Sequence, residues 1–468
     1  MPCYGAMETP PQNPHDVPLP DLGHTAPGGP PGANPLLATS PTVPVNAADP
    51  ATPGGGRPLA NLGYAERVDF MVELATRLHR YGTTAQRLEA ALLDVAARLR
   101  VECEPWSSPT ALILSFSDPQ RVTGSSDITR VVRLSPGDTD LHRLAETDRV
   151  AEALIAGELD VAGAFDALRA LDVPPTRWSR VAEVLGAGLV CAAIAALLRL
   201  PWLEIGVAGF NGLVIGVLLQ GAMTRPWLRD ASDALLAMFA TLVTVLVAGL
   251  VAPINQNTVI IASLIPLLPG LTLTNSVNEL TSGHLVSGTS RFAGAVTTVA
   301  KLAVGTAIAL YLAHLVGLDP QVRAWRPQPD WVEWSALAAA ALAFAVAFRA
   351  ELRDYPVVMA ASAAGYLVSR HADLAWGAPV GIFLAAMLMT AAGNGYAQLT
   401  GRPGAIVRVP GIILLVPGSA SLRGLLNLLQ QQDVNVGQEA MLGVMNILLA
   451  LLAGLLLGNL LLPSRRHL

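Results

Sequence analysis

The sequence predicts a predominantly α-helical membrane protein of about ten transmembrane helices, with a small soluble α+β domain ahead of them. Of its 468 residues, 52% are hydrophobic and only 14% are charged, and the mean hydropathy is +0.48. Soluble domains carry about 25% charged residues, so this composition indicates a chain that lies largely in lipid. The long apolar runs all come after about residue 180, which places the membrane part in the C-terminal portion.

Residues 1–60 are rich in Pro, Gly, Ala and Asn, as in "PGGPPGANP" and "ATPGGGRP". Such a stretch cannot bury a core, so we predict a disordered tail. It lacks the basic start, apolar middle and cleavage site of a signal peptide. A dispensable extension is the simpler interpretation, and a regulatory tail is the alternative.

Residues 61–176 are predicted to form a cytoplasmic α+β domain. "AERVDFMVELATRLHRYGTTAQRLEAALLDVAARL" has the apolar spacing of two helices, broken at Gly82 and Thr83. "VECEPW", "TALILSFSD" and "ITRVVRLS" are typical of strands, and two more helical patterns follow. His79 and His142 stand beside arginines, so we expect them on solvated faces.

Several function classes find no support in the sequence. It contains no phosphate loop, no Cys/His metal set and no nucleophile elbow, so we expect no cofactor and no enzymatic activity. The formal net charge of −5 is mild and argues against a nucleic-acid partner.

The membrane region divides into two sets of five predicted spans, each near the roughly 20 residues that a bilayer requires. The first set occupies residues 177–318 and the second occupies residues 325–463. Their spans lie near 181–200, 203–222, 231–252, 258–274, 288–317, 331–350, 355–370, 374–399, 404–421 and 437–462. Arginines near the span ends gather on the side of the N-terminus, which predicts that both termini are cytoplasmic.

The two sets look like copies of one another. Pro269-Gly270 in "IPLLPGLTLTNSV" matches Pro417-Gly418 in "ILLVPGSASLRGL". The glycine pairs that also match are Gly288 with Gly437, Gly294 with Gly443, and Gly305 with Gly454. Because five is an odd number, a tandem copy enters the membrane in the opposite sense, so we predict inverted repeats. Transporters commonly use this arrangement, since it offers two exchangeable conformations.

The paired Pro-Gly breaks indicate discontinuous helices in the fourth and ninth spans. Proline removes an amide donor and glycine loosens the next turn. Unpaired backbone groups are tolerated at membrane depth only where protein or a water-filled cavity covers them. We therefore expect the two breaks to face each other and to offer free helix ends to a polar ligand. A proline kink that only assists packing is the alternative.

Polar residues near the spans are further candidates for a substrate or proton pathway. Lys301 lies inside the fifth span, where a charge is costly, although its stem would also let it reach the interface. Asn275, Asn278 and Glu279 follow the first break at helical spacings. Glu279 is a candidate to carry a proton or to pair with Lys301 or Arg291. An interfacial helix without a ligand role explains the same pattern.

Two single amides complete the candidates. Asn211 in "GFNGLVIG" and Asn394 in "AAGNGYA" lie within predicted spans. Each would either line a pathway or form hydrogen bonds between helices.

These segments together resemble the threonine/serine exporter (ThrE) family. The resemblance rests on "LHRYGTTAQRLEAAL", "SSPTALILSF", "LLPGLTLTNSVNELTSGHLVSGTSRFAGA" and "VPGIILLVPGSASLRGLL", and it covers about residues 64–462. It implies proton-driven secondary export of small amino acids by a ten-span inner-membrane protein. Glu279 and Arg291 occupy the places of an acidic residue and an arginine that the family usually carries. His284 stands where the family often has Asp.

The leading hypothesis is therefore a secondary active transporter that exports threonine or serine across the cytoplasmic membrane. Its partners would be the substrate, protons and the lipid bilayer, and the oligomeric state is left open. One alternative is an exporter of another small solute such as a dicarboxylate, which some related members are thought to move. The other is a membrane-anchored sensor or scaffold whose soluble domain binds the ligand.

Overall fold

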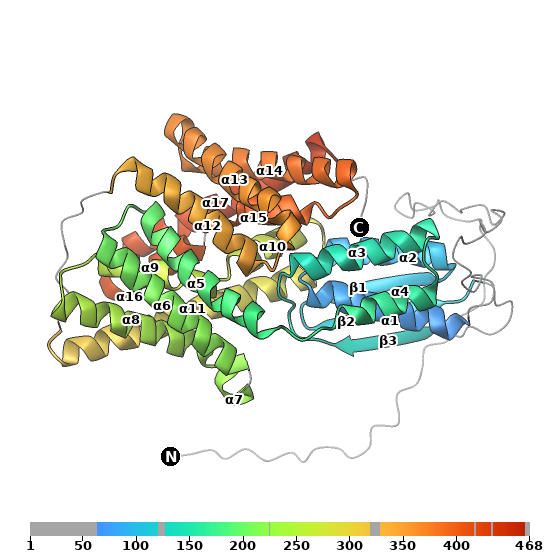
Figure 1. Ribbon diagram of the computed structural model, residues 1–468, viewed down its shortest axis with the longest axis horizontal. Coiled ribbons are helices and arrows are strands. Elements are labelled where there is room, and N and C mark those ends of the chain that lie inside the picture. The colour runs from blue at the N-terminus through green and yellow to red at the C-terminus, as the bar shows by residue number, and fades with distance from the viewer. Residues whose placement is uncertain are drawn as a thin grey trace, which may run out of the picture. The chain divides into compact units, whose positions relative to one another are not determined.

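The computed structural model describes residues 63–119, 127–223, 225–318, 328–415, 418–431 and 434–463. The predicted tail at 1–60 lies outside these residues. The rest is mostly helical, with one small sheet (Figure 1).

The predicted soluble domain (residues 63–170) contains two helices, three strands and two more helices, in the order that the sequence predicts. These are α1 (Tyr64–Arg80), α2 (Ala85–Leu99), β1 (Glu102–Ser108), β2 (Ala111–Ser117), β3 (Ile128–Arg133), α3 (Leu141–Ala156) and α4 (Val161–Ala170). The strands form an antiparallel sheet in the order β1-β2-β3. Along β2 the buried residues alternate, so that Leu112, Leu114 and Phe116 face the helices.

One expectation for this part is wrong. His79 is buried rather than solvated, and its Nε2 lies 3.1 Å from the Pro109 carbonyl oxygen and 3.2 Å from that of Ser135. The turn between β1 and β2 and the segment after β3 contact His79, which a helical pattern alone does not reveal. Burial lowers the pKa of this imidazole.

Seven of the described helices are long and apolar enough to cross a membrane, or eight if the bent pair α9 and α10 counts as one span. These figures support a multi-pass membrane protein and do not reach the ten spans of the prediction. The helices are α5 (Arg177–Leu197), α6 (Trp202–Met223), α7 (Pro226–Arg229), α8 (Ser232–Leu250), α9 (Gln256–Ser263), α10 (Gly270–Thr281), α11 (Leu285–Leu315), α12 (Asp330–Ala347), α13 (Tyr355–Trp376), α14 (Ala378–Thr400), α15 (Ala405–Ile413), α16 (Gly418–Gln431) and α17 (Val434–Leu461).

The helix at the predicted seventh span is longer than 355–370, since α13 continues to Trp376. Its last two turns contain Arg370, His371 and Asp373. These polar residues also reduce its hydropathy, and α13 is not one of the seven helices that qualify as spans.

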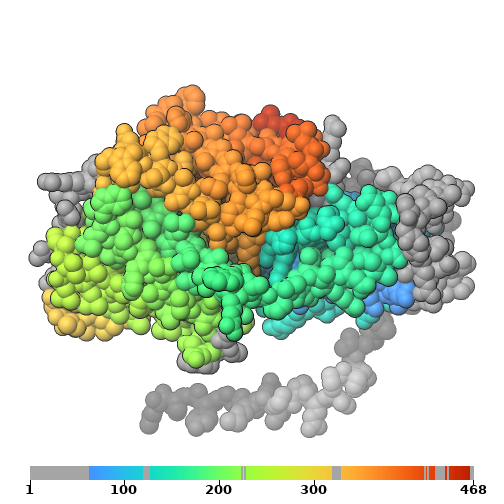
Figure 2. All heavy atoms as spheres, in the orientation of Figure 1, coloured from blue at the N-terminus to red at the C-terminus, as the bar shows by residue number. Residues whose placement is uncertain are grey.

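Helices α5 and α12 pack against each other in opposite directions and carry a similar ion pair at each end. Arg199, just after α5, pairs with Glu333 near the start of α12 at 2.6 Å. Arg349, just after α12, pairs with Glu183 near the start of α5 at 2.9 Å. Both arginines have a left-handed backbone, with φ of 56° and 50°. In Figure 2 the green surface of the earlier helices adjoins the orange surface of the later ones.

A close helix contact recurs at two of the glycines matched by sequence. Helix α11 packs on α8, and a Cβ at Gly305 would collide with the Ala234 carbonyl oxygen. Helix α17 packs on α14, and a Cβ at Gly454 would collide with the Phe383 carbonyl oxygen. Small residues allow membrane helices to approach this closely. Gly305 and Gly454 therefore each allow a neighbouring helix to approach closely.

Candidate functional site

Both predicted spans with a Pro-Gly pair are interrupted. The first consists of α9, a 3-10 turn at Ile265–Leu267 and α10, with a bend of 49°. The second ends its first helix at Ile413 and resumes at Gly418. Pro417 lies outside the described residues.

The two interruptions meet. A Cβ built on Gly418 would lie 3.2 Å from the Leu268 Cβ and 3.5 Å from the Gly270 Cα. This contact agrees with the prediction that the two breaks face each other. It brings the ends of two half-helices from opposite halves of the sequence to one place.

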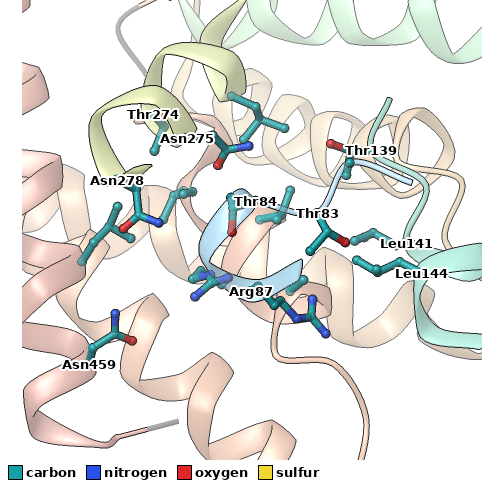
Figure 3. A pocket seen from close by; sticks show the side chains of 17 residues that line it. Thr83, Thr84, Arg87, Thr139, Leu141, Leu144, Thr274, Asn275, Asn278 and Asn459 are labelled. Atoms are coloured by element: carbon teal, nitrogen blue, oxygen red, sulfur yellow. The ribbon is translucent and has the colours of Figure 1, made fainter. Parts of the chain in front are cut away.

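Next to these half-helices lies a cavity of about 50 Å³ that three parts of the chain enclose. Helix α10 contributes Asn275 and Asn278, which face the beginning of α2 in Figure 3. The soluble domain contributes Thr83, Thr84 and Arg87. On the remaining sides are Arg408 of α15 and Asn459 of α17. The soluble domain is thus a wall of the cavity rather than a separate unit.

The cavity carries an uncompensated positive charge. Arg408 is half-buried, and it has no hydrogen bond or ion pair with any residue that the structure describes. Arg87 is neutralised by the buried Asp148 of α3. None of the described residues that line the cavity is acidic. The Thr83 hydroxyl is also buried there, without a partner among the described residues. The cavity therefore suits a ligand that brings a carboxylate.

Glu279 joins the soluble domain to the membrane helices beside this cavity. Its fully buried carboxylate accepts a hydrogen bond from the Ala85 amide at 2.9 Å, and Ala85 is the first residue of α2. It also accepts from the Ser287 hydroxyl at 2.8 Å and from the Arg291 Nε at 2.9 and 3.0 Å. Arg291 in turn donates to the Thr83 carbonyl at 3.4 Å. A carboxylate at a helix N-terminus is favoured by the helix dipole.

The turn between α10 and α11 makes a second connection to the same domain. The His284 Nε2 lies 3.1 Å from a carboxylate oxygen of Glu89 in α2. The other Glu89 oxygen accepts from the amide and hydroxyl of Ser107 in β1, at 2.8 and 2.9 Å. A continuous chain of polar contacts therefore runs from the membrane helices to the sheet.

The structure separates two of the predicted site residues from this region. Lys301 does not meet Glu279; its Nζ lies 3.7 Å from Asp233 at the start of α8, and 38% of its side chain is exposed. The Asn211 amide nitrogen donates to the Ala240 carbonyl and to the hydroxyls of Thr244 and Ser263. For Asn211 this favours the interpretation of a hydrogen bond between helices.

Asn394 lies at the border of the site. Its amide nitrogen donates to the Asn459 side chain at 2.9 Å and to the Leu462 carbonyl at 2.8 Å. It therefore positions a residue that lines the cavity, although it does not line the cavity itself.

Sequence reasoning missed Arg408, Arg87, Thr83 and Asn459 as residues of the site. Arg408 served only as an indicator of membrane orientation, although it lies inside the predicted ninth span. A charge between apolar residues in "AIVRVPGII" was the signal that could have identified it. The other three gave no such signal, because only the tertiary contact between domain and membrane helices places them here.

Two family models together match most of the chain. Residues 69–313 match a model described as "Putative threonine/serine exporter", and residues 334–461 match one described as "Threonine/Serine exporter, ThrE". The chain belongs to the threonine/serine exporter (ThrE) family. Exporters of this family are transporters, and the apolar helices of this member place it in a membrane as a multi-pass protein.

Two relatives of this ThrE member are similar over much of its length. A "Probable threonine/serine exporter" of Mycobacterium tuberculosis is 24% identical over 450 residues, which cover 91% of this chain and 81% of the relative. An uncharacterised protein of Schizosaccharomyces pombe is 22% identical over 374 residues, covering 77% of this chain and 48% of the relative. No solved structure matches the chain.

Proposed function

We propose that this protein exports small amino acids such as threonine and serine across the cytoplasmic membrane, using the proton motive force. Both termini would be cytoplasmic. The family and the relative named as a probable threonine/serine exporter support export. The observation that carries the substrate site is the cavity that Arg408, free of any partner among the described residues, lines together with Asn275 and Asn278.

The chemistry of the cavity fits an amino acid in the following way. The substrate carboxylate would bind the Arg408 guanidinium, because a charged hydrogen bond in a partly dry site is strong. The ammonium group would donate to the amide oxygens of Asn275, Asn278 or Asn459. The hydroxyl of threonine or serine would form a hydrogen bond with the Thr83 hydroxyl, which has no partner among the described residues. Each polar group of the substrate thus has a partner of matching type.

An inverted-repeat arrangement of ten spans belongs to the same proposal. Helix α11 meets the soluble domain near its beginning, through Arg291 and Thr83. Its counterpart α17 meets the domain near its end, since Asn459 and Thr83 line one cavity. The opposite directions of α5 and α12 support the same symmetry. Two exchangeable halves of this kind would allow alternating access.

Export is tested with the full-length protein in proteoliposomes. We expect labelled threonine or serine to move when a pH gradient is imposed, and to stop moving when a protonophore is added. Transport that persists with the protonophore would refute proton coupling while leaving export intact. Liposomes without protein provide the baseline.

A second substrate class has a specific observation in its favour. Two arginines and no acidic residue are found among the described residues that line the cavity, so the ammonium of an amino acid meets no countercharge. A dicarboxylate would instead place one carboxylate on Arg408 and the other near Arg87. Counterflow with a four-carbon dicarboxylate against threonine separates the two, because only the true substrate accelerates exchange.

The sensor or scaffold hypothesis predicts something different. It requires ligand binding by the soluble domain without transport. The shared cavity favours transport, because the soluble domain and the membrane helices form its walls together. Ligand binding without any counterflow would restore the sensor hypothesis.

A further inference from the structure

We propose that the soluble domain is the cytoplasmic gate of the cavity, and that the joint between Glu279 and the first turn of α2 is the latch that holds the gate closed. This inference rests on the proposed function, because a gate presupposes a solute that passes. It assigns a task to residues 63–170 that neither the family descriptions nor the relatives mention.

The latch and the cavity wall are built from neighbouring residues. Thr83, Thr84 and Arg87 line the cavity, while the Ala85 amide between them binds Glu279. On the membrane side, Asn278 lines the cavity and Glu279 follows it directly. Any motion that separates Ala85 from Glu279 must therefore also separate the two walls.

The present state of the cavity requires such a motion. A cavity that holds benzene measures about 150 Å³, whereas this one measures about 50 Å³. Threonine and serine have more non-hydrogen atoms than benzene. The walls must move apart before an amino acid can occupy the site, and the wall formed by α2 belongs to the domain that the latch holds.

The latch is strong enough to hold a closed state and specific enough to be released. Glu279 receives hydrogen bonds from α2, from Ser287 and from Arg291, so its buried charge is fully compensated. The Thr84 side chain makes no capping hydrogen bond to α2, which leaves Glu279 as the acceptor for the first turn. Withdrawal of α2 would break the Ala85, Thr83 and His284–Glu89 contacts and would leave the Glu279–Arg291 pair intact.

The substitution Ala85→Pro removes the latch donor and little else. Proline is favoured at the first position of a helix, where its missing N–H would otherwise need a partner. The residue before a proline must be extended, and Thr84 already has φ −71° and ψ 154°. The matched control is Ala85→Ser, which also changes the buried side chain but keeps the amide.

The readout is cysteine labelling of the full-length protein in nanodiscs, which needs neither a substrate nor a known membrane orientation. Asn278→Cys places a thiol in the cavity wall, in a chain with Cys3→Ser; Cys103 and Cys191 are buried. We expect a hydrophilic maleimide to label this thiol about tenfold faster in Ala85→Pro than in Ala85→Ser, the effect of losing one hydrogen bond to a charged acceptor.

A second variant covers the case in which Ala85→Pro does not fold. Ser287→Ala removes a donor that would still compensate the Glu279 charge after α2 withdraws, so opening becomes more costly and we expect slower labelling than in the wild type. Equal labelling rates in all variants would overturn the gate. Accelerated labelling, in a protein that moves neither threonine nor serine, would support the gate and refute the amino-acid proposal. Export of threonine or serine by the wild type, with the same labelling rate in all variants, would support the amino-acid proposal and refute the gate.

Discussion

Two arginines lie near the first turn of α2, and their surroundings are opposite. Arg291 forms a two-oxygen contact with Glu279, and only 10% of its side chain is exposed. Arg408 faces the cavity with no partner among the described residues. Taking a charge out of water is costly unless an opposite charge compensates it. The difference teaches that Arg291 serves the structure and that Arg408 is kept for something that the chain does not itself supply.

The comparison predicts that the largest loss of stability comes from Arg291→Gln. Glu279 would then remain buried without its cation, and removing one partner of a buried pair costs about 3–5 kcal/mol. Thermal unfolding in detergent should show a clear drop in Tm. The control Arg353→Gln removes an arginine whose side chain is 55% exposed and should change Tm little. Equal Tm values for the two variants would contradict the distinction.

Arg408→Gln should reduce transport and leave stability intact, which is the opposite of the effect expected for Arg291→Gln. We expect loss of threonine counterflow by about ten- to a hundredfold, because the substrate carboxylate loses a charged hydrogen bond. Stability should hold or rise, since an uncompensated charge is removed. Arg408→Lys keeps the charge without the planar fork and should retain part of the activity. If Arg408→Gln lowered Tm as much as Arg291→Gln, its role would be structural.

Arg87 lines the cavity as Arg408 does, but it is paired with a carboxylate as Arg291 is. Its partner, Asp148, allows the pairing to be tested by the pH dependence of stability. Burial raises the pKa of Asp148 to about 6, even though Arg87 opposes the shift. The folded protein therefore keeps this proton at a pH where the unfolded chain has lost it. Stability should fall by about 3 kcal/mol as the pH rises from about 4 to 6 and then level off.

The measurement is the Tm of the wild type and of Asp148→Asn between pH 4.5 and 7.5. Their difference should change over the lower half of this range and be constant above it. Asp166→Asn, at an exposed position of α4, is the control and should leave the wild-type pH profile unchanged. A constant difference between the wild type and Asp148→Asn throughout would show that Asp148 does not titrate there.

The smallest effect is expected for Lys301→Ala. Its pair with Asp233 is 3.7 Å long and partly exposed, and such pairs contribute at most about 1 kcal/mol. Transport should remain near the wild-type rate in the counterflow assay. A severe loss of transport at normal Tm would return Lys301 to the pathway, as its position inside the fifth span first suggested.

Much of the fold could be predicted because its signals are local. The apolar runs, the helical and strand spacings and the two Pro-Gly pairs each depend on residues close together in the chain. The breaks at Gly270 and Gly418 were expected to face each other, and they do. The site could be predicted only in part: Asn275 and Asn278 line the cavity, whereas Lys301 and Asn211 lie elsewhere.

The sequence by itself determined where most helices begin and where they break. These properties follow from backbone geometry and from the transfer of apolar side chains out of water, which act within a few turns of chain. Only the tertiary structure decided which charges are paired. Ala85 and Glu279 are 194 positions apart, yet one hydrogen bond joins them. The free energy of a buried charge depends on its partner in space, and for Arg408 the described chain provides none.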